Sequence, residues 1–178
     1  MRLFIAIEFP KEIKDYIEES TKLLKASCKS GNFSLKENYH LTLVFIGEVP
    51  SSRVKDITAV VDDCECKPFD LQIGEFSRFK CNDGDILFRK LNTPNELLRL
   101  QSSLHEELLE KGFTLQERNF CPHITLARRA TLLNEIRLSE LSKDIMPLFC
   151  AVSNISLMLS QCIGGKLTYT TLYRKELS

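Results

Sequence analysis

Two of the three histidines in this 178-residue chain stand in the same local pattern. His40 and His123 are each followed by an apolar residue, a threonine and a leucine, and the threonines are Thr42 and Thr125. Histidine has an ordinary pKa close to neutral pH, and a threonine hydroxyl can donate a hydrogen bond to an anion. The repeated pair therefore indicates acid–base chemistry beside an anionic group. The alternative is two ordinary core histidines, and finding the hydroxyl at the same offset twice disfavours it.

Both motifs lie in segments that alternate between apolar and polar residues, which is typical of a strand with one buried face. We expect these strands at about 40–46 and 121–127. Residues i and i+2 share a face of a strand, so each histidine projects beside its threonine, about 7 Å away along the chain. The opposite face should be anchored in a core by the intervening residues, which are Leu41, Leu43, Ile124 and Leu126.

Two imidazoles facing each other across a cleft can serve as one base and one acid near neutral pH, and two hydroxyls can hold phosphate oxygens. This set predicts phosphodiester cleavage without a metal. A metal site is the competing use of histidine, but neither motif contains Asp or Glu, and threonine is a poor zinc ligand. Cys64 and Cys66 form an isolated Cys-x-Cys, which we interpret as an exposed turn and not as a zinc site. With no glycine-rich phosphate loop in the sequence, we expect no cofactor.

Three further side chains near the motifs bear on the chemistry. Alternation would place Cys121 on the face of His123, which allows a Cys–His nucleophile. Pro122 can distort that register, however, and a free cysteine is more often a small apolar filler. His105 has no hydroxyl two residues later, so we interpret it as a helix-surface residue outside the chemistry. Arg128 directly follows the second motif strand, where it is either a phosphate contact or a solvated strand end; we include it among the candidate substrate-binding residues.

The motifs lie 83 residues apart, and the elements around them repeat. After a first strand over 2–9, each half is predicted to run helix, motif strand, helix, strand, turn, strand. This order indicates an internal duplication, with two lobes related by a pseudo-twofold axis and the motif strands facing a cleft between them. We expect one domain over 1–178 with interleaved lobes. The predicted helices cover 10–27, a segment from Pro50, 93–112 and 132–143, and the other strands cover 68–79, 85–91, 148–160 and 166–174.

The composition limits partners and compartment. The chain is 43% hydrophobic, and its 24 basic residues balance 24 acidic ones, which excludes a globally basic nucleic-acid binder. It has no apolar run of the roughly 20 residues needed to cross a bilayer, so we expect no membrane contact. The start, MRLFIAIEFP, does not resemble a signal peptide, and seven cysteines then favour free thiols in a reducing compartment. We therefore expect a cytoplasmic protein, and a monomer.

The chain resembles the two-histidine phosphoesterase superfamily, and within it the bacterial RNA 2′,3′-cyclic phosphodiesterases, also called 2′-5′ RNA ligase-like proteins. The resemblance runs nearly end to end. It is carried by RLFIAI at 2–7, HLTLVFIG at 40–47, FCPHITLAR at 120–128, and the closing Ser160, Gly165, Tyr169 and Leu172.

This resemblance implies a bilobal α+β fold with two antiparallel sheets around a central groove. It also implies metal-free hydrolysis of an RNA 2′,3′-cyclic phosphate to a 2′-phosphomonoester. In that chemistry His40 would protonate the leaving 3′ oxygen, His123 would activate water, and Thr42 and Thr125 would bind the phosphate. Three alternatives stay open: a cyclic phosphodiesterase of small nucleotides, a 2′-5′ RNA ligase, and a nucleotide-binding module without turnover.

Overall fold

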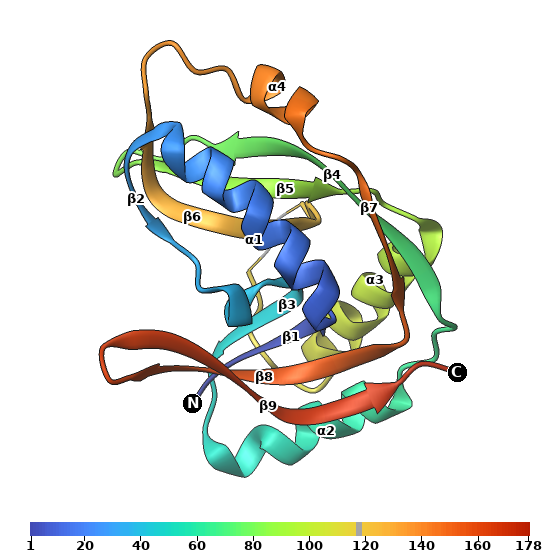
Figure 1. Ribbon diagram of the computed structural model, residues 1–178. Coiled ribbons are helices and arrows are strands. Elements are labelled where there is room, and N and C mark those ends of the chain that lie inside the picture. Colours follow the sequence, from blue (N-terminus) through green and yellow to red (C-terminus); the bar gives the residue numbers. More distant parts are fainter. Residues whose placement is uncertain (117–118) are drawn as a thin grey trace.

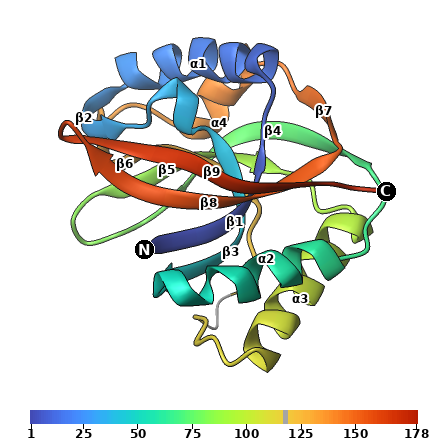
Figure 2. The same cartoon turned by 90° about the horizontal axis from the view of Figure 1, so that it is seen from below.

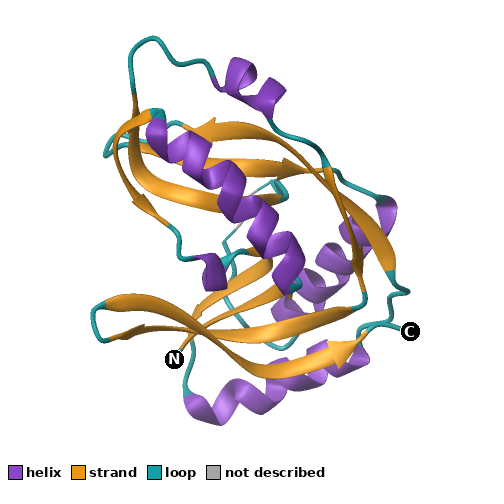
Figure 3. Cartoon of the chain, in the orientation of Figure 1, coloured by secondary structure: helices purple, strands orange, loops and turns teal. Residues whose placement is uncertain are grey.

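The computed structural model describes residues 1–116 and 119–178. Its strands form two antiparallel sheets with helices packed outside them (Figures 1 and 3), which confirms the α+β fold class predicted from the sequence. The elements are β1 (Arg2–Glu8), α1 (Lys11–Ala26), β2 (Cys28–Phe33), η1 (Lys36–Asn38), β3 (His40–Glu48), η2 (Ser51–Arg53), α2 (Val54–Asp63), β4 (Phe69–Phe79), β5 (Asp85–Leu91), α3 (Asn95–Glu110), β6 (His123–Leu132), α4 (Leu138–Leu141), η3 (Ser142–Asp144), β7 (Leu148–Val152), β8 (Asn154–Ile163) and β9 (Lys166–Glu176).

The two halves of the chain exchange their hairpins. One sheet has the order β3-β1-β8-β9, so the C-terminal hairpin completes the sheet of the first motif strand. The other sheet has the order β2-β6-β5-β4-β7, so the β4–β5 hairpin of the first half lies beside the second motif strand. Each motif strand therefore shares its sheet with a hairpin from the opposite half.

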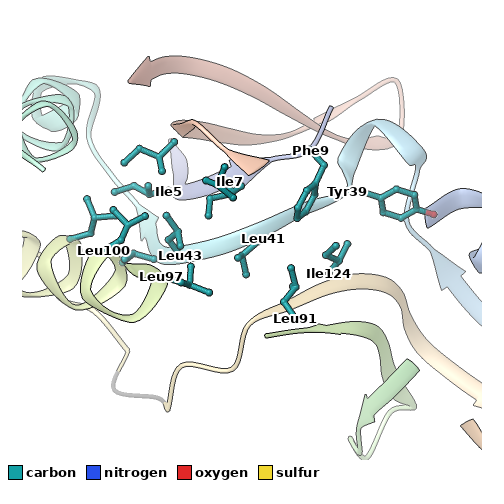
Figure 4. Close-up of a cluster of buried hydrophobic side chains, with 14 of the residues drawn as sticks. Ile5, Ile7, Phe9, Tyr39, Leu41, Leu43, Leu91, Leu97, Leu100 and Ile124 are labelled. Atoms are coloured by element: carbon teal, nitrogen blue, oxygen red, sulfur yellow. The ribbon is translucent and has the colours of Figure 1, made fainter. Parts of the chain in front are cut away.

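The apolar faces of both motif strands lie in one hydrophobic core. Leu41, Leu43, Ile124 and Leu126 are at most 3% exposed, which confirms the predicted alternation. Figure 4 shows Leu41 and Leu43 close to Leu97 of α3, and Ile124 in the same cluster. The helices α2 and α3 lie on one side of the molecule and α1 on the other (Figure 2). The core therefore holds one face of each motif strand, and the histidines and threonines lie on the other, half-buried face.

Arg89 of β5 is the largest fully buried side chain, at 1% exposure. Its guanidinium donates to the carbonyls of Ile73 (3.3 Å), Gly74 and Met146 (3.3 Å), and to the Ser20 hydroxyl (2.9 Å). Burial lowers its pKa to about 10. The register of β4 against β5 is irregular between Ile73 and Phe76, and two of the carbonyls that Arg89 binds, those of Ile73 and Gly74, lie in this part of β4. Arg89 satisfies these oxygens and fastens α1 to the sheet.

Several predicted elements differ from the observed ones. The strand predicted over 148–160 is two strands in different sheets, β7 and β8. The helix predicted over 132–143 is wrong in extent, because β6 continues to Leu132 and only Leu138–Leu141 is α-helical. The short strand β2 was not predicted. It approaches β6 so closely that a Cβ on Gly31 would lie 3.1 Å from the Ala130 Cβ.

The cysteines behave as free thiols. The Cys-x-Cys segment is a loop as predicted, but Cys64 is buried and not exposed, because its side chain packs into the main core. In the described part of the chain, no helix is both long and apolar enough to span a membrane.

Candidate functional site

His40 stands at the first position of β3 and is held by the segment before it. Its Nδ1 donates to the carbonyl oxygen of Asn38 at 2.7 Å, and its Nε2 lies 2.9 Å from the Thr42 hydroxyl. The intervening Tyr39 is fully buried and donates its hydroxyl hydrogen to Glu18 at 2.6 Å. The helix α1 thereby fixes the backbone that orients the imidazole.

His123 stands at the first position of β6 and is held in the same way. Its Nδ1 donates to the carbonyl oxygen of Cys121, two residues earlier, at 2.7 Å. When one ring nitrogen of a neutral imidazole carries a proton for such a bond, the other is left bare. In both motifs the bare nitrogen is Nε2, which leaves it free to accept a proton.

Each imidazole is packed between two aromatic rings. The His40 ring lies 5.0 Å from the rings of Phe4 and Tyr169, and the His123 ring lies 5.2 Å from Phe79 and 5.1 Å from Phe88. Sequence reasoning assigned none of these rings to the cleft, although Phe4 and Tyr169 lie in segments that carry the family resemblance. Phe4 and Phe88 lie in strands whose apolar residues occupy both faces, so alternation could not assign them to the cleft.

The four motif side chains line two adjacent cavities crosswise. One cavity, of about 430 Å³, is lined by Thr42 and His123, and the other, of about 580 Å³, by His40 and Thr125. The His40–Thr42 hydrogen bond joins a wall of one cavity to a wall of the other. We call the two cavities together the central cleft, and the structure brings both motifs to it.

Burial and one arginine set the electrostatics of the cleft. The pKa of His40 is lowered to about 4, mainly by desolvation and then by the charges of Lys14, His123 and Arg128, while the hydrogen bond to Asn38 acts in the opposite direction. The pKa of His123 is also lowered, first by desolvation and then by the charge of Arg128. Arg128 lines the His40 cavity together with Thr125, so it lies beside the motifs, and its contact with a phosphate stays a prediction. Both shifts favour the neutral form of the imidazoles.

Cys121 and His105 both lie at the cleft. Cys121 precedes the first residue of β6, and it lines the 430 Å³ cavity together with His123. It is exposed, and its carbonyl holds the imidazole. His105, predicted at the helix surface, is half-buried and lines the same cavity together with Gln101. Local helical spacing does not show what a residue at the helix surface faces in the fold.

The position of Cys121 predicts the result of a conservative change. Cys121→Ser keeps the carbonyl that orients His123, so we expect kcat to change less than about threefold, since ordinary surface substitutions have small effects. The measurement is phosphodiester turnover of the two proteins at equal concentration. Loss of turnover with an unchanged melting temperature would mean that the thiol takes part in the chemistry.

Comparison with known families agrees with this geometry. Residues 9–161 match the family model described as the 2′-5′ RNA ligase superfamily. The chain belongs to this superfamily. The assignment made from the paired motifs is thereby confirmed.

Curated and solved proteins are similar to this chain over most of its length. An RNA 2′,3′-cyclic phosphodiesterase of Methanothermobacter thermautotrophicus is 27% identical, over 97% of this chain and 96% of its own length. One of Thermotoga maritima is 30% identical, over 72% of this chain and 70% of its own. The crystal structure of Escherichia coli LigT complexed with 3′-AMP matches with a TM-score of 0.82 and 27% identity, covering 99% of this chain and 98% of that one.

Proposed function

We propose that this protein hydrolyses the 2′,3′-cyclic phosphate at the end of an RNA to a 2′-phosphomonoester. The observation that carries the proposal is the crosswise placement of two carbonyl-fixed histidines and two threonines around one cleft. The names of the superfamily relatives support the same reaction class. The roles of His40 as the acid and His123 as the base are those that the superfamily resemblance implies.

In this mechanism a water enters beside His123 and attacks phosphorus. Nε2 of His123 takes a proton from the water as the new P–O bond forms. The bond from phosphorus to the 3′ oxygen breaks, and Nε2 of protonated His40 gives its proton to that oxygen. The product has a 2′-phosphate and a 3′-hydroxyl. The histidines return to their starting protonation states by exchange with solvent.

Thr42, Thr125 and Arg128 would hold the phosphate as charge builds on its non-bridging oxygens. The hydroxyl of Thr42 faces the bare Nε2 of neutral His40 at 2.9 Å. Once His40 is protonated, Nε2 becomes a donor, and the Thr42 hydroxyl hydrogen is free to turn toward phosphate. Donors arranged before the reaction stabilise the transition state without reorganisation cost, which is a large source of rate enhancement.

The shifted pKa values predict an acidic optimum. Both imidazoles have pKa values below the ordinary 6.5 because they are buried, and kcat/KM reports the groups of the free enzyme. We therefore expect a bell-shaped profile of kcat/KM centred below pH 6.5. Bound phosphate adds negative charge, which raises both pKa values, so the kcat profile should lie at higher pH. A kcat/KM optimum above pH 7 would contradict these shifts.

The decisive test of the proposal is a product assay on an oligoribonucleotide that ends in a 2′,3′-cyclic phosphate. We expect a product with a 2′-phosphate, formed at the same rate in excess EDTA. A 3′-phosphate product would reverse the assignment of the leaving oxygen, and loss of activity in EDTA would contradict the metal-free mechanism.

The same assay separates the alternatives. Turnover of a cyclic mononucleotide in preference to the oligonucleotide would indicate a small-nucleotide enzyme. Joined strands in the presence of a 5′-hydroxyl RNA would indicate ligase activity. Tight binding without product over hours would indicate a binding module.

A further inference from the structure

The direction in which the RNA lies in the cleft follows from the in-line geometry of the proposed displacement at phosphorus, so this inference rests on the proposed function. Attacking water and leaving oxygen stand on opposite sides of phosphorus in an in-line displacement. The leaving 3′ oxygen belongs to the terminal ribose, which must therefore lie on the side of the acid. His40 lines the 580 Å³ cavity, and His123 lines the other. The terminal nucleoside and the RNA chain attached to it belong in the His40 cavity.

The His40 cavity has a basic wall, which we define as Arg128, Arg129 and Lys166. All three side chains are exposed, and Arg129 donates to the exposed carboxylate of Asp83 at 3.1 Å. Among the described residues, none of those that line this cavity is Asp or Glu. A chain without net charge thus concentrates cations on the side where the RNA backbone would leave the cleft.

A β-bulge turns two consecutive arginines toward the same cavity. Neighbouring residues of a regular strand point to opposite faces. In β6, however, Arg128 and Arg129 together stand opposite the single residue Ile86 of β5, because Asp85 pairs with Ala130 and Leu87 with Ala127. Arg129 adopts a φ of +52°, in the left-handed region that non-glycine residues rarely enter. Such backbone is concentrated at functional sites.

The bulge is supported by its neighbour across the sheet. Gly84 lies against the backbone of Arg129, and a Cβ at this position would meet the Arg129 carbonyl carbon at 2.7 Å. Lys166, the third residue of the basic wall, is the first residue of β9 in the β8–β9 hairpin, whose tip extends past the rest of its sheet (Figure 1). The Asn38 amide fastens this hairpin by donating to the carbonyl of Leu167 at 2.8 Å, and it thereby holds Lys166 at the cavity.

We infer that the RNA leaves the cleft over the basic wall, and that Arg129 and Lys166 bind the phosphate on the 5′ side of the terminal nucleotide. Arg128, which acts on both histidines, stays with the reacting phosphate. Arg129 and Lys166 then determine the preference for an oligonucleotide over a mononucleotide.

The test compares a cyclic-phosphate hexaribonucleotide with 2′,3′-cyclic AMP in the Arg129→Gln/Lys166→Gln double variant. We expect kcat/KM for the hexanucleotide to fall about tenfold more than that for the mononucleotide, because two exposed cations no longer attract the RNA backbone. Its dependence on salt should also become less steep, by about 0.7 in the log–log slope for each phosphate that is no longer neutralised. The matched control is Lys22→Gln/Lys143→Gln, which removes two exposed lysines paired with Glu19 and Glu140 away from the cleft and should leave both substrates unaffected.

The Asp83→Asn variant should change kcat/KM for the hexanucleotide in the opposite direction. This variant removes the carboxylate that neutralises Arg129, so kcat/KM for the hexanucleotide should rise about twofold at low salt. Equal reductions for both substrates in the double variant, or a salt slope like that of the control, would overturn the inference while leaving the proposed function intact. If the unmodified protein processes neither substrate, the proposed function itself fails.

Discussion

The His40→Ala and His123→Ala variants are each expected to lose about a thousandfold in kcat on RNA ending in a 2′,3′-cyclic phosphate. Each imidazole transfers one proton in the proposed transition state, and a positioned acid or base contributes about 10²- to 10⁴-fold. The measurement is product formation under saturating substrate. The two variants should also lose different limbs of the pH profile: the alkaline limb without the acid His40, and the acidic limb without the base His123.

The third histidine provides the matched control. His105 lines the same cavity as His123 but lacks the carbonyl bond and the threonine of the motifs. His105→Ala should cost less than about fivefold in kcat, since it removes no proton-transfer group. If His105→Ala were as damaging as either motif variant, while all three proteins kept their melting temperatures, the assignment of acid and base to the motifs would be wrong.

Arg89→Ala is expected to lower the free energy of unfolding by about 3 kcal/mol. The change empties a buried site and leaves carbonyls of Ile73, Gly74 and Met146 without their donor. An unpaired buried acceptor costs about 1–3 kcal/mol. Arg89 lines a cavity of about 620 Å³ together with Ser20 and Met146, and water that enters from it recovers part of this cost. Denaturant unfolding monitored by circular dichroism measures the difference.

The adjacent Lys90 is the control for Arg89. Its side chain is exposed and pairs with exposed Glu75 at 2.7 Å, an arrangement that usually contributes less than about 1 kcal/mol. Lys90→Ala should therefore leave the unfolding midpoint nearly unchanged. Equal effects of the two substitutions would mean that Arg89 does not stabilise the irregular part of β4.

The paired motifs were predictable because strand alternation needs only local sequence. Leu41 and Ile124 are apolar and their neighbours His40 and His123 are not, so the alternation in each strand predicts which face is buried. The aromatic rings around the imidazoles could not be found in this way, since Phe4 belongs to a strand with apolar residues on both faces. Arg128 was a candidate substrate-binding residue because it follows the second motif strand. Arg129 lines the same cavity because of the β-bulge, and the bulge depends on close contact between Gly84 and the Arg129 backbone.

Fold prediction failed where the signal depends on tertiary pairing. The segment from 148 to 160 is rich in apolar residues on both sides of Ser153, and its local pattern does not show that β7 and β8 belong to different sheets. The strand β2, with sequence CKSGNF, has no alternation, and its pairing depends on close approach at Gly31. Strong helices such as α3 were found because a long amphipathic stripe is a local property.

The exchange of hairpins has a consequence for how the protein is made. β1 pairs with β8, with Arg2 opposite Ser160, so the first strand of the chain cannot complete its pairing until a strand near the other end of the chain has been synthesised. Contacts of such sequence separation slow folding, because a long loop must close before they stabilise anything. Until β8 has been synthesised, the edge of β1 that will pair with it has no hydrogen-bonding partner. A nascent chain that stops before residue 154 would therefore expose this edge of β1 to aggregation. We expect the His40 side of the cleft to form only after β8 and β9 have been synthesised.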